Sequence, residues 1–371
     1  MKKILSFIFI SAFTLGSIFA VEYGGLINSD SSFKKNGSDD FVFTEKLDTS
    51  AYLKVPFSKE GHTTLSAEIV YRFQYDDAKI DHFINMPLLK LNHSSTVSDG
   101  LINIAAGRFS IAENTGKIFN QTSDGLFGSY QTGSFMTSLY FGYTGLVNRY
   151  FTTMNEMGIT EYSGFTSDYY TSSLPYMVIG AEFALPNLFL EQSLGIASWN
   201  FIGIQKLKSN KIYGTLSLNG PLMANLYHNT HGIFAANFGD GTKQFAGLAS
   251  TMLSYYFNYR GLAANAGITY ASKDFQTVTN TSGLVTGDPW TNIFLPSVSV
   301  SMLPISSLYV AVETNFALVA ENMEYAGTGI AGVVSYQLLS DVALGLNASH
   351  FFAKHEAANY TQISIKAAIS F

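Results

Sequence analysis

The sequence predicts an all-β protein: a transmembrane, antiparallel, up-and-down β-barrel of about 16–18 strands. Three observations predict this fold. Apolar and polar side chains alternate along many segments of about ten residues, tight and long connections alternate between those segments, and charged residues are scarce. Charged residues make up 13% of the chain and aromatic residues 15%, whereas charged residues average about 25% in globular domains. This composition fits strands that turn one face toward lipid.

The first twenty residues predict an export signal. Lys2 and Lys3 precede an almost unbroken apolar run over residues 4–13, and small residues up to Ala20 supply a cleavage zone. We expect residues 1–20 to be a cleaved signal peptide and residues 21–371 to form a single barrel domain. Removing the two lysines changes the formal net charge from −6 to −8, which argues against nucleic acid as a partner.

The alternation of period two continues to the last residue. From Tyr360 the chain reads YTQISIKAAISF, which places Ile365 and Phe371 on one face and Lys366 on the other. A soluble protein rarely ends on such a strand, because the strand would leave an apolar edge unpaired. A terminal strand that finishes in Phe resembles the signal read by the machinery that inserts outer-membrane barrels. The resemblance implies that Phe371 is the insertion signal and that the protein is exported through the periplasm to a bacterial outer membrane.

Similar strands recur upstream, and the connections between them alternate in length. The alternation is clearest over residues 64–76, 262–270, 297–302, 308–316 and 342–349. Counted back from Phe371, loops such as 354–359 and 321–327 alternate with tight turns such as 339–341 and 219–221, and a further loop is expected at 30–40. The count reaches eighteen strands, with sixteen left open because the segments near 123–131 and 211–218 alternate least clearly. No stretch after the signal peptide is apolar for about 18 residues, so no transmembrane helix is expected.

A barrel of this size has a lumen that its own side chains cannot fill. The strand pattern begins by Glu22, which leaves no room for an N-terminal plug and favours an open channel. The architecture resembles that of general outer-membrane porins over the whole mature chain, without a shared motif. The resemblance implies passive diffusion of small hydrophilic solutes, a surrounding of outer-membrane lipid, insertion machinery as a partner during biogenesis, and a possible homotrimer.

Strand alternation also selects candidate lumen-facing charges, because a charge on the lipid face costs about 2–4 kcal/mol near the midplane. The candidates are Lys54, Glu68, Arg72, Glu182, Glu191, Glu313 and Lys366. Four acidic residues against three basic ones lean slightly toward cations. Each candidate is alternatively a solvated wall residue with no specific role.

The third external connection, within residues 110–122, follows Arg108 and reads IAENTGKIFNQT from residue 111. In general porins the third external loop folds into the lumen and sets the pore size. The resemblance in position implies a constriction loop in which Glu113, Lys117 and Asn120 meet the solute. The alternative is an ordinary surface loop.

Nothing in the sequence predicts an enzyme. The chain has no cysteine and no G-x-S-x-G motif, and His228 and His231 lie three residues apart, which on a strand puts them on opposite faces. We therefore expect no catalytic residues, no metal site and no cofactor. Two other functions stay open: a surface adhesin that uses the long aromatic loop 149–170, and a transporter of hydrophobic solutes.

Overall fold

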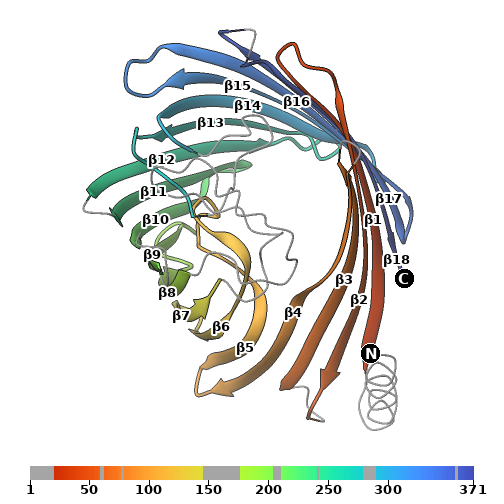
Figure 1. Cartoon of the computed structure of the whole chain (residues 1–371). Helices are drawn as coiled ribbons and strands as arrows, with labels where there is room; N and C mark the ends of the chain where they lie inside the picture. The colour runs from red at the N-terminus through yellow and green to blue at the C-terminus, as the bar shows by residue number, and fades with distance from the viewer. Residues whose placement is uncertain are drawn as a thin grey trace.

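The computed structural model describes residues 21–58, 62–76, 79–144, 176–203, 210–239, 242–278, 290–355 and 358–371. Within these residues, eighteen strands form one antiparallel sheet that closes into a barrel (Figure 1). The strands are β1 Glu22–Asn36, β2 Val42–Pro56, β3 Thr63–Asp76, β4 Lys79–Val97, β5 Gly100–Ala112, β6 Asn120–Gln131, β7 Met136–Tyr143, β8 Tyr176–Leu185, β9 Ser193–Gly203, β10 Asn210–Met223, β11 Leu226–Gly239, β12 Thr242–Tyr256, β13 Ala263–Ala271, β14 Ile293–Ile305, β15 Leu308–Val319, β16 Tyr325–Leu339, β17 Val342–Ala353 and β18 Tyr360–Ser370. The expected signal peptide and the loop 149–170 lie outside the described residues.

The barrel closes by pairing its first strand with its last. Each strand pairs with its neighbours in sequence, and β1 also pairs with β18, with Leu26 opposite Ser370. The backbones of Gly25 and Phe371 add two hydrogen bonds, of 2.8 and 3.1 Å. Closure satisfies the two edges that an open sheet would expose. The predicted all-β, up-and-down barrel is confirmed, at the upper of the two strand counts.

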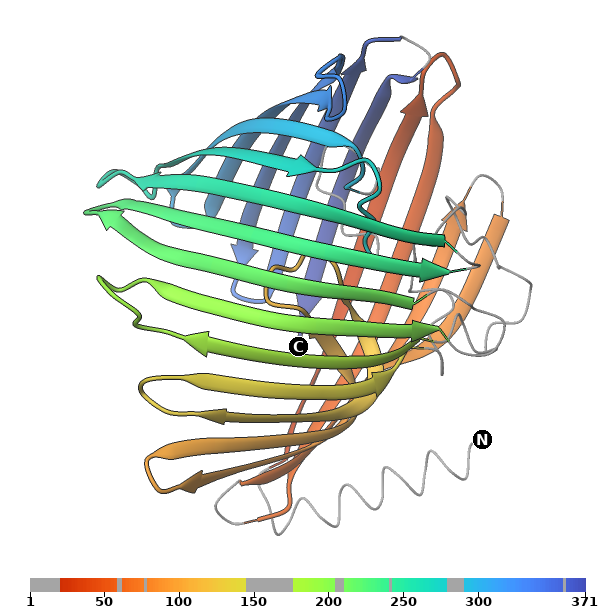
Figure 2. The same cartoon turned by 90° about the vertical axis from the view of Figure 1, so that its left-hand side faces the viewer.

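The two ends of the barrel differ in their connections, as Figure 2 shows. We call the end that carries Glu22, Phe371 and the short turns, such as 98–99 and 340–341, the turn end, and the opposite end the loop end. The turn predicted at 219–221 is wrong by a few residues. Pro221 pairs with Tyr227 inside the β10–β11 ladder, and the chain reverses next to Asn225, whose φ is 65°.

The loop predicted at 30–40 is also shorter than expected. The polar residues up to Asn36 continue β1, because Asn36 pairs with Tyr360 and Lys34 pairs with Val42. Only residues 37–41 connect β1 to β2. Polar composition was therefore a poor guide here: a strand whose inner face lines a lumen carries polar residues at every second position.

Apolar side chains cover the outer surface of the barrel. Ile363, Ile365 and Ile369 are exposed on the outer face of β18, while Ser364 and Lys366 between them face inward. The same alternation exposes Leu344 and Leu346 on β17. Within the described ranges, no helix is long and apolar enough to cross a membrane.

An apolar core lies inside the barrel, against the inner faces of β5–β13. On the wall it includes Trp199 and Phe201 of β9 and Tyr213 of β10. Two connections from the loop end complete it: Ile118 and Phe119 come from the β5–β6 connection, and Phe275 and Val278 come from the segment after β13. In Figure 1 these two segments run inside the ring of strands. We call this set of residues the luminal cluster; it fills one side of the lumen and does not include side chains of β15–β18 or β1–β3.

Gly107 on β5 is required by its backbone and its neighbours. Its φ is +118°, and a Cβ built there would lie 2.1 Å from the carbonyl oxygen of Leu89. We expect Gly107→Ala to destabilise the barrel by about 2–3 kcal/mol, because alanine is strained at this φ and collides with backbone. Thermal unfolding in detergent micelles, followed by circular dichroism, measures the change. Gly128→Ala on β6 is the matched control, since a Cβ at Gly128 meets no atom within 4 Å; equal melting of the two variants would contradict the prediction.

Candidate functional site: the barrel lumen

Charged side chains line the inner faces of β18, β1, β2 and β3. Lys366 lies 3.6 Å from Asp30, and Asp30 is opposite Lys46 in the β1–β2 register. One layer toward the turn end, Arg72 donates two hydrogen bonds of 2.5 Å to the two carboxylate oxygens of Asp48. The inner faces of four neighbouring strands therefore form a continuous array of positive and negative groups.

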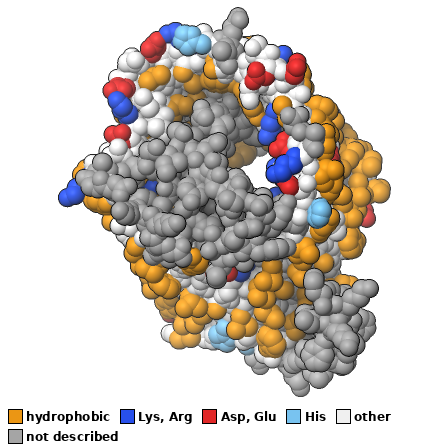
Figure 3. Space-filling model, viewed as in Figure 1, with side chains coloured by type: hydrophobic (Ala, Val, Ile, Leu, Met, Phe, Trp, Pro, Cys, Tyr) orange, Lys and Arg blue, Asp and Glu red, His pale blue; other side chains and the backbone are white. Residues whose placement is uncertain are grey.

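We call this array the charged wall. It consists of Asp30, Lys34, Lys46, Asp48, Arg72, Asp76 and Lys366. Figure 3 shows blue and red side chains gathered beside a hollow on the right of the molecule, where Figure 1 places β1–β3. Between the layer of Lys34 and the layer of Arg72, the wall holds four basic groups against three acidic ones, and the Lys46 side chain is exposed. The net charge of the wall is positive. The lumen-facing candidates chosen from the sequence have the opposite sign, with a slight excess of acidic residues.

Of these residues, only Arg72 and Lys366 were predicted from the sequence to face the lumen. Asp30 and Lys46 were missed because the polar run of β1 was taken for a loop and because β2 carries charges on both faces. Glu45 lies on the outer face of β2, where its carboxylate accepts hydrogen bonds from Ser29 and Ser31. Aligning residues 22–36 with 42–56 as a hairpin would have placed the missing charges, since the register is unbroken.

The other sequence candidates are spread around the barrel. Lys54 forms an exposed ion pair of 3.0 Å with Glu22 at the turn end. Glu68 lies on the same face of β3 as Arg72, and Glu313 lies on the inner face of β15, opposite Ser299. The structure therefore places Lys54 and Glu68 on neighbouring strands, on the turn-end side of the charged wall, and Glu313 apart from them.

Glu191 occupies a different place from the one expected. It lies in the turn between β8 and β9, with a φ of 62°, and not on a strand. Strand alternation therefore gives no orientation for its side chain. The turn begins after Leu185 and extends to Gln192, because the Leu188 and Gln192 backbones hydrogen-bond across it.

The β5–β6 connection, residues 113–119, folds against the luminal cluster. Glu113 is only 3% exposed. Its carboxylate accepts hydrogen bonds from the Thr115 backbone and hydroxyl and from the backbone N–H groups of Lys117 and Ile118, at 2.5–2.9 Å. Glu113 was expected to meet the solute; instead it holds its own loop in shape, because the buried carboxylate needs these donors.

Asn114 attaches this loop to the barrel wall. Its backbone N–H donates to Glu182 Oε1 at 3.1 Å, and its side-chain oxygen accepts from Thr215 Oγ1 at 2.6 Å. The same Glu182 oxygen accepts from the Trp199 indole at 3.2 Å. Glu182 thus faces inward, and its carboxylate binds the loop and a luminal aromatic residue.

A second segment from the loop end packs on the first. The Val278 N–H donates to the Ile118 carbonyl at 2.9 Å, and the Tyr213 hydroxyl donates to the Gln276 carbonyl at 2.8 Å. The ammonium group of Lys211 lies 3.4 Å from the Thr277 carbonyl. The inward course of this segment could not be predicted from the sequence, because no residue in it indicates that it turns into the lumen.

The remaining loop candidates differ in environment. Lys117 is partly buried, and its ammonium group lies 4.6 Å from the centre of the Trp290 ring. Burial lowers the pKa of Lys117, and the nearby Glu113 carboxylate partly opposes that shift. Asn120 is exposed at the start of β6, on the opposite face from the buried Gln121. Strand alternation thus turns Asn120 away from the lumen.

Polar side chains also line a hollow on the inner wall of β3–β6. Its volume is about 490 Å³, and Ser66, Lys90, Asn92 and Asn103 contribute to its lining. The hydroxyl of Ser94 donates to Asn103 at 3.1 Å. This surface suits water and small polar solutes, because its donors and acceptors point into the lumen.

The fold is similar to those of solved bacterial proteins. Pseudomonas aeruginosa OpdQ aligns with a TM-score of 0.66 at 11% identity, over 95% of this chain and 99% of that one. P. aeruginosa OccK2 (OpdF) gives 0.66 at 13% identity over 95% and 98%, and a BenF-like porin from Pseudomonas fluorescens Pf-5 gives 0.63 at 13% over 95% and 98%. No protein-family model and no curated protein matches the sequence. The chain therefore shares the barrel fold of these proteins along almost its whole length.

Proposed function

We propose that the protein is a bacterial outer-membrane channel for the passive diffusion of small hydrophilic solutes. One observation carries the proposal: a closed barrel with an apolar outer surface has a charged wall on one side of its lumen and a packed apolar cluster on the other. Eighteen strands enclose more space than wall side chains fill. The likeness to a BenF-like porin supports the same function.

The charged wall favours anions in this proposal. Its four basic groups exceed its three acidic ones by one, and rings or rows of basic side chains attract anions in pores. OccK2 has been solved in complex with glucuronate, a small hydrophilic carboxylate, and it aligns at 14% identity with a TM-score of 0.63 over 95% of this chain and 96% of that one. We therefore propose small carboxylates as the preferred solutes.

In this proposal the turn end faces the periplasm and the loop end faces outward, the arrangement of bacterial barrels with short periplasmic turns. Residues 1–20 act as the export signal, and Phe371 acts as the insertion signal. The hydrogen bonds between Gly25 and Phe371 join the two ends of the mature chain at that side. A homotrimer remains part of the proposal.

Conductance in planar lipid bilayers tests the channel. We expect the purified barrel to add discrete, long-lived current steps, with a Cl⁻/K⁺ permeability ratio above one. A folded barrel, verified by its resistance to SDS at room temperature, that adds no current would overturn the proposal. The adhesin hypothesis would then gain support, with loop 149–170 as its contact surface.

The third hypothesis, a transporter of hydrophobic solutes, has less support. Such a path needs accessible apolar surface in the lumen. Two segments that fold into the lumen instead cover the aromatic residues of the luminal cluster. Among these residues, Phe119, Phe201 and Phe275 are fully buried. Liposome swelling with a sugar acid and with an apolar solute of equal size compares the two functions directly, and a faster response to the apolar solute would favour the transporter.

A further inference from the structure

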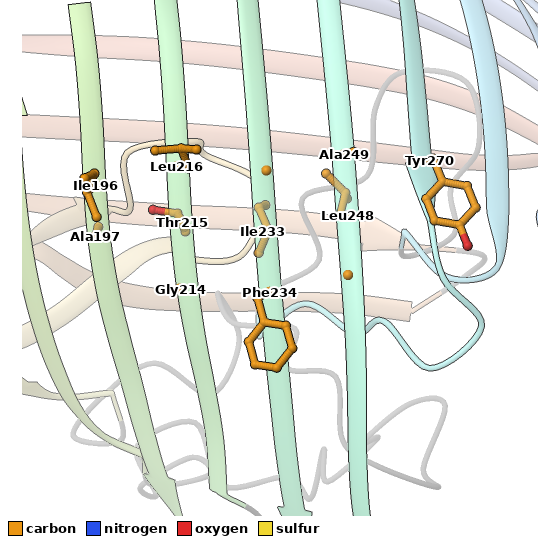
Figure 4. Close-up of a pocket in the computed structure, with 12 residues that line it drawn as sticks. Ile196, Ala197, Gly214, Thr215, Leu216, Ile233, Phe234, Leu248, Ala249 and Tyr270 are labelled. Atoms are coloured by element: carbon orange, nitrogen blue, oxygen red, sulfur yellow. The ribbon is translucent and has the colours of Figure 1, made fainter.

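The outer surface of the barrel has a groove over β9–β13, shown in Figure 4. Its volume is about 560 Å³, and its described lining contains no charged residue. The floor is formed by Gly214 on β10, Gly232 on β11, and Gly247 and Ala249 on β12. The groove is on the outer face, because the residues beside these glycines, such as Ile233 and Leu248, belong to the luminal cluster.

Large apolar side chains form the walls of the groove. Leu216, Gly232, Ala249 and Tyr270 are consecutive cross-strand partners from β10 to β13, so they form one row. Phe234, which is 57% exposed, lies between Gly214 and Gly247 in the neighbouring row. In Figure 4 the rings of Phe234 and Tyr270 flank the strand β12. The groove is therefore a shallow depression of the outer surface, bordered by Leu216, Phe234 and Tyr270.

The floor glycines are not required by the fold. None of the three has a positive φ. A Cβ built at Gly214 or Gly232 meets no atom within 4 Å, and a Cβ at Gly247 comes no closer than 3.5 Å to the Ile233 carbonyl oxygen. Glycine weakens a strand, and it often marks the close approach of a ligand or another chain. The missing side chains thus leave space that something outside the barrel can occupy.

A cationic group lies above the groove at the loop end. Lys243 on β12 is exposed and has the same alternation as Phe245, Gly247 and Ala249, so it belongs to the outer face. Between Lys243 and the floor, the ring of Phe245 stacks on Phe234 with centroids 6.1 Å apart. Gly247 is four positions after Lys243 along the strand, a distance of roughly 13 Å. An apolar groove below a lysine matches a lipid, with its chain in the groove and its anionic headgroup at the ammonium group.

We propose that this groove binds one phospholipid of net negative charge in the outward-facing leaflet, with an acyl chain over Gly232 and Gly247 and the anionic headgroup at Lys243. The proposal uses the membrane orientation given under the proposed function. Van der Waals packing holds the acyl chain in the groove. Removal from water contributes nothing, because an unbound acyl chain is also surrounded by hydrocarbon. Lys243 supplies the preference for an anionic headgroup.

Native mass spectrometry of the full barrel in detergent, titrated with phosphatidylglycerol or phosphatidylcholine, tests the proposal. We expect the wild type to retain one phosphatidylglycerol more strongly than phosphatidylcholine. Gly232→Leu fills the floor and is expected to lower phosphatidylglycerol binding by roughly fivefold or more. Lys243→Ala is expected to remove the headgroup preference, a change of roughly fivefold, which corresponds to the about 1 kcal/mol that one lysine contributes at an anionic surface.

Two matched controls separate the groove from the rest of the outer surface. Gly128→Leu adds the same side chain at an outer-face glycine on β6 that is equally uncrowded. Lys35→Ala removes an outer-face lysine at the loop end of β1. Equal loss of lipid in Gly232→Leu and Gly128→Leu would overturn the proposal. A wild-type oligomer that Gly232→Leu dissociates would also overturn it, because the groove would then be covered by a second copy.

The lipid result and the channel result are separable. All substituted side chains are on the outer face, so each variant is expected to conduct like the wild type. A barrel that binds the lipid and carries no current would contradict the proposed function and leave the lipid site standing. A barrel that conducts but shows no lipid preference would contradict the lipid site and leave the proposed channel function standing.

Discussion

Replacing Lys46 with Glu is expected to lower the Cl⁻/K⁺ permeability ratio by roughly tenfold. Lys46 is an exposed basic residue of the charged wall, opposite Asp30 and one layer from the Arg72–Asp48 pair. A unit charge 4 Å from an ion contributes about 1 kcal/mol in water, and the substitution changes the local charge by two units. Reversal potentials across a KCl gradient measure the ratio, and the effect is expected to shrink at high salt.

The control for this prediction is Lys35→Glu. Lys35 is the neighbour of a wall residue in sequence but has the opposite alternation, and its ammonium group lies 5.5 Å from the ring centre of Phe41 at the loop end. The net charge of the protein changes equally in both variants. If Lys35→Glu shifts the ratio as strongly as Lys46→Glu, the selectivity comes from the overall field of the molecule and not from the charged wall.

The barrel itself could be predicted from sequence because period two is a local property. The alternation of Ile363, Ile365 and Phe371 indicates an outer face without information about the neighbouring strands, and turn residues mark the ends of each strand. The predicted strand boundaries were wrong where one residue type occurs in two kinds of structure. Pro221 signals a turn in most contexts, yet it lies in a strand here, because Asn225 provides the reversal.

The lumen could be predicted only in part, because its contents depend on contacts between distant segments. Strand alternation correctly turned Glu182 inward, but nothing near it in sequence indicates that it binds Asn114, which is 68 residues away. The luminal cluster likewise joins Phe119 to Trp199 and Val278 to Ile118. Aromatic residues of such strands are expected at the membrane interfaces, and several of them instead form the core inside the barrel.

The loop that carries Glu113 gives the second large prediction. The buried carboxylate accepts four hydrogen bonds from the loop. A hydrogen bond to a charged group contributes about 1.5–3 kcal/mol, and the contributions of four bonds to one carboxylate are less than additive. We expect Glu113→Ala to destabilise the folded loop by roughly 3–6 kcal/mol. The barrel should still close, because β5 and β6 keep their own ladder. Single-channel conductance should rise and fluctuate as the loop leaves the luminal cluster.

The chain offers an internal reporter for this prediction. Its only two tryptophans, Trp199 and Trp290, both lie next to the loop: Trp199 shares the Glu182 oxygen with Asn114, and Trp290 is under Lys117. Detachment should expose both rings and shift their fluorescence to longer wavelength. Glu324→Ala is the control, since it removes a carboxylate that pairs with Lys354 on an exposed connection.

Fluorescence and conductance together separate a loose loop from a damaged barrel. A red shift with a larger, unsteady conductance and unchanged resistance to SDS means that Glu113 holds a constriction. A red shift without any change in conductance means that the loop folds inward without narrowing the path, so the charged wall alone would set the permeation properties. Unchanged fluorescence in Glu113→Ala contradicts the prediction itself, because the contacts of Asn114 and Val278 would then hold the loop without the carboxylate.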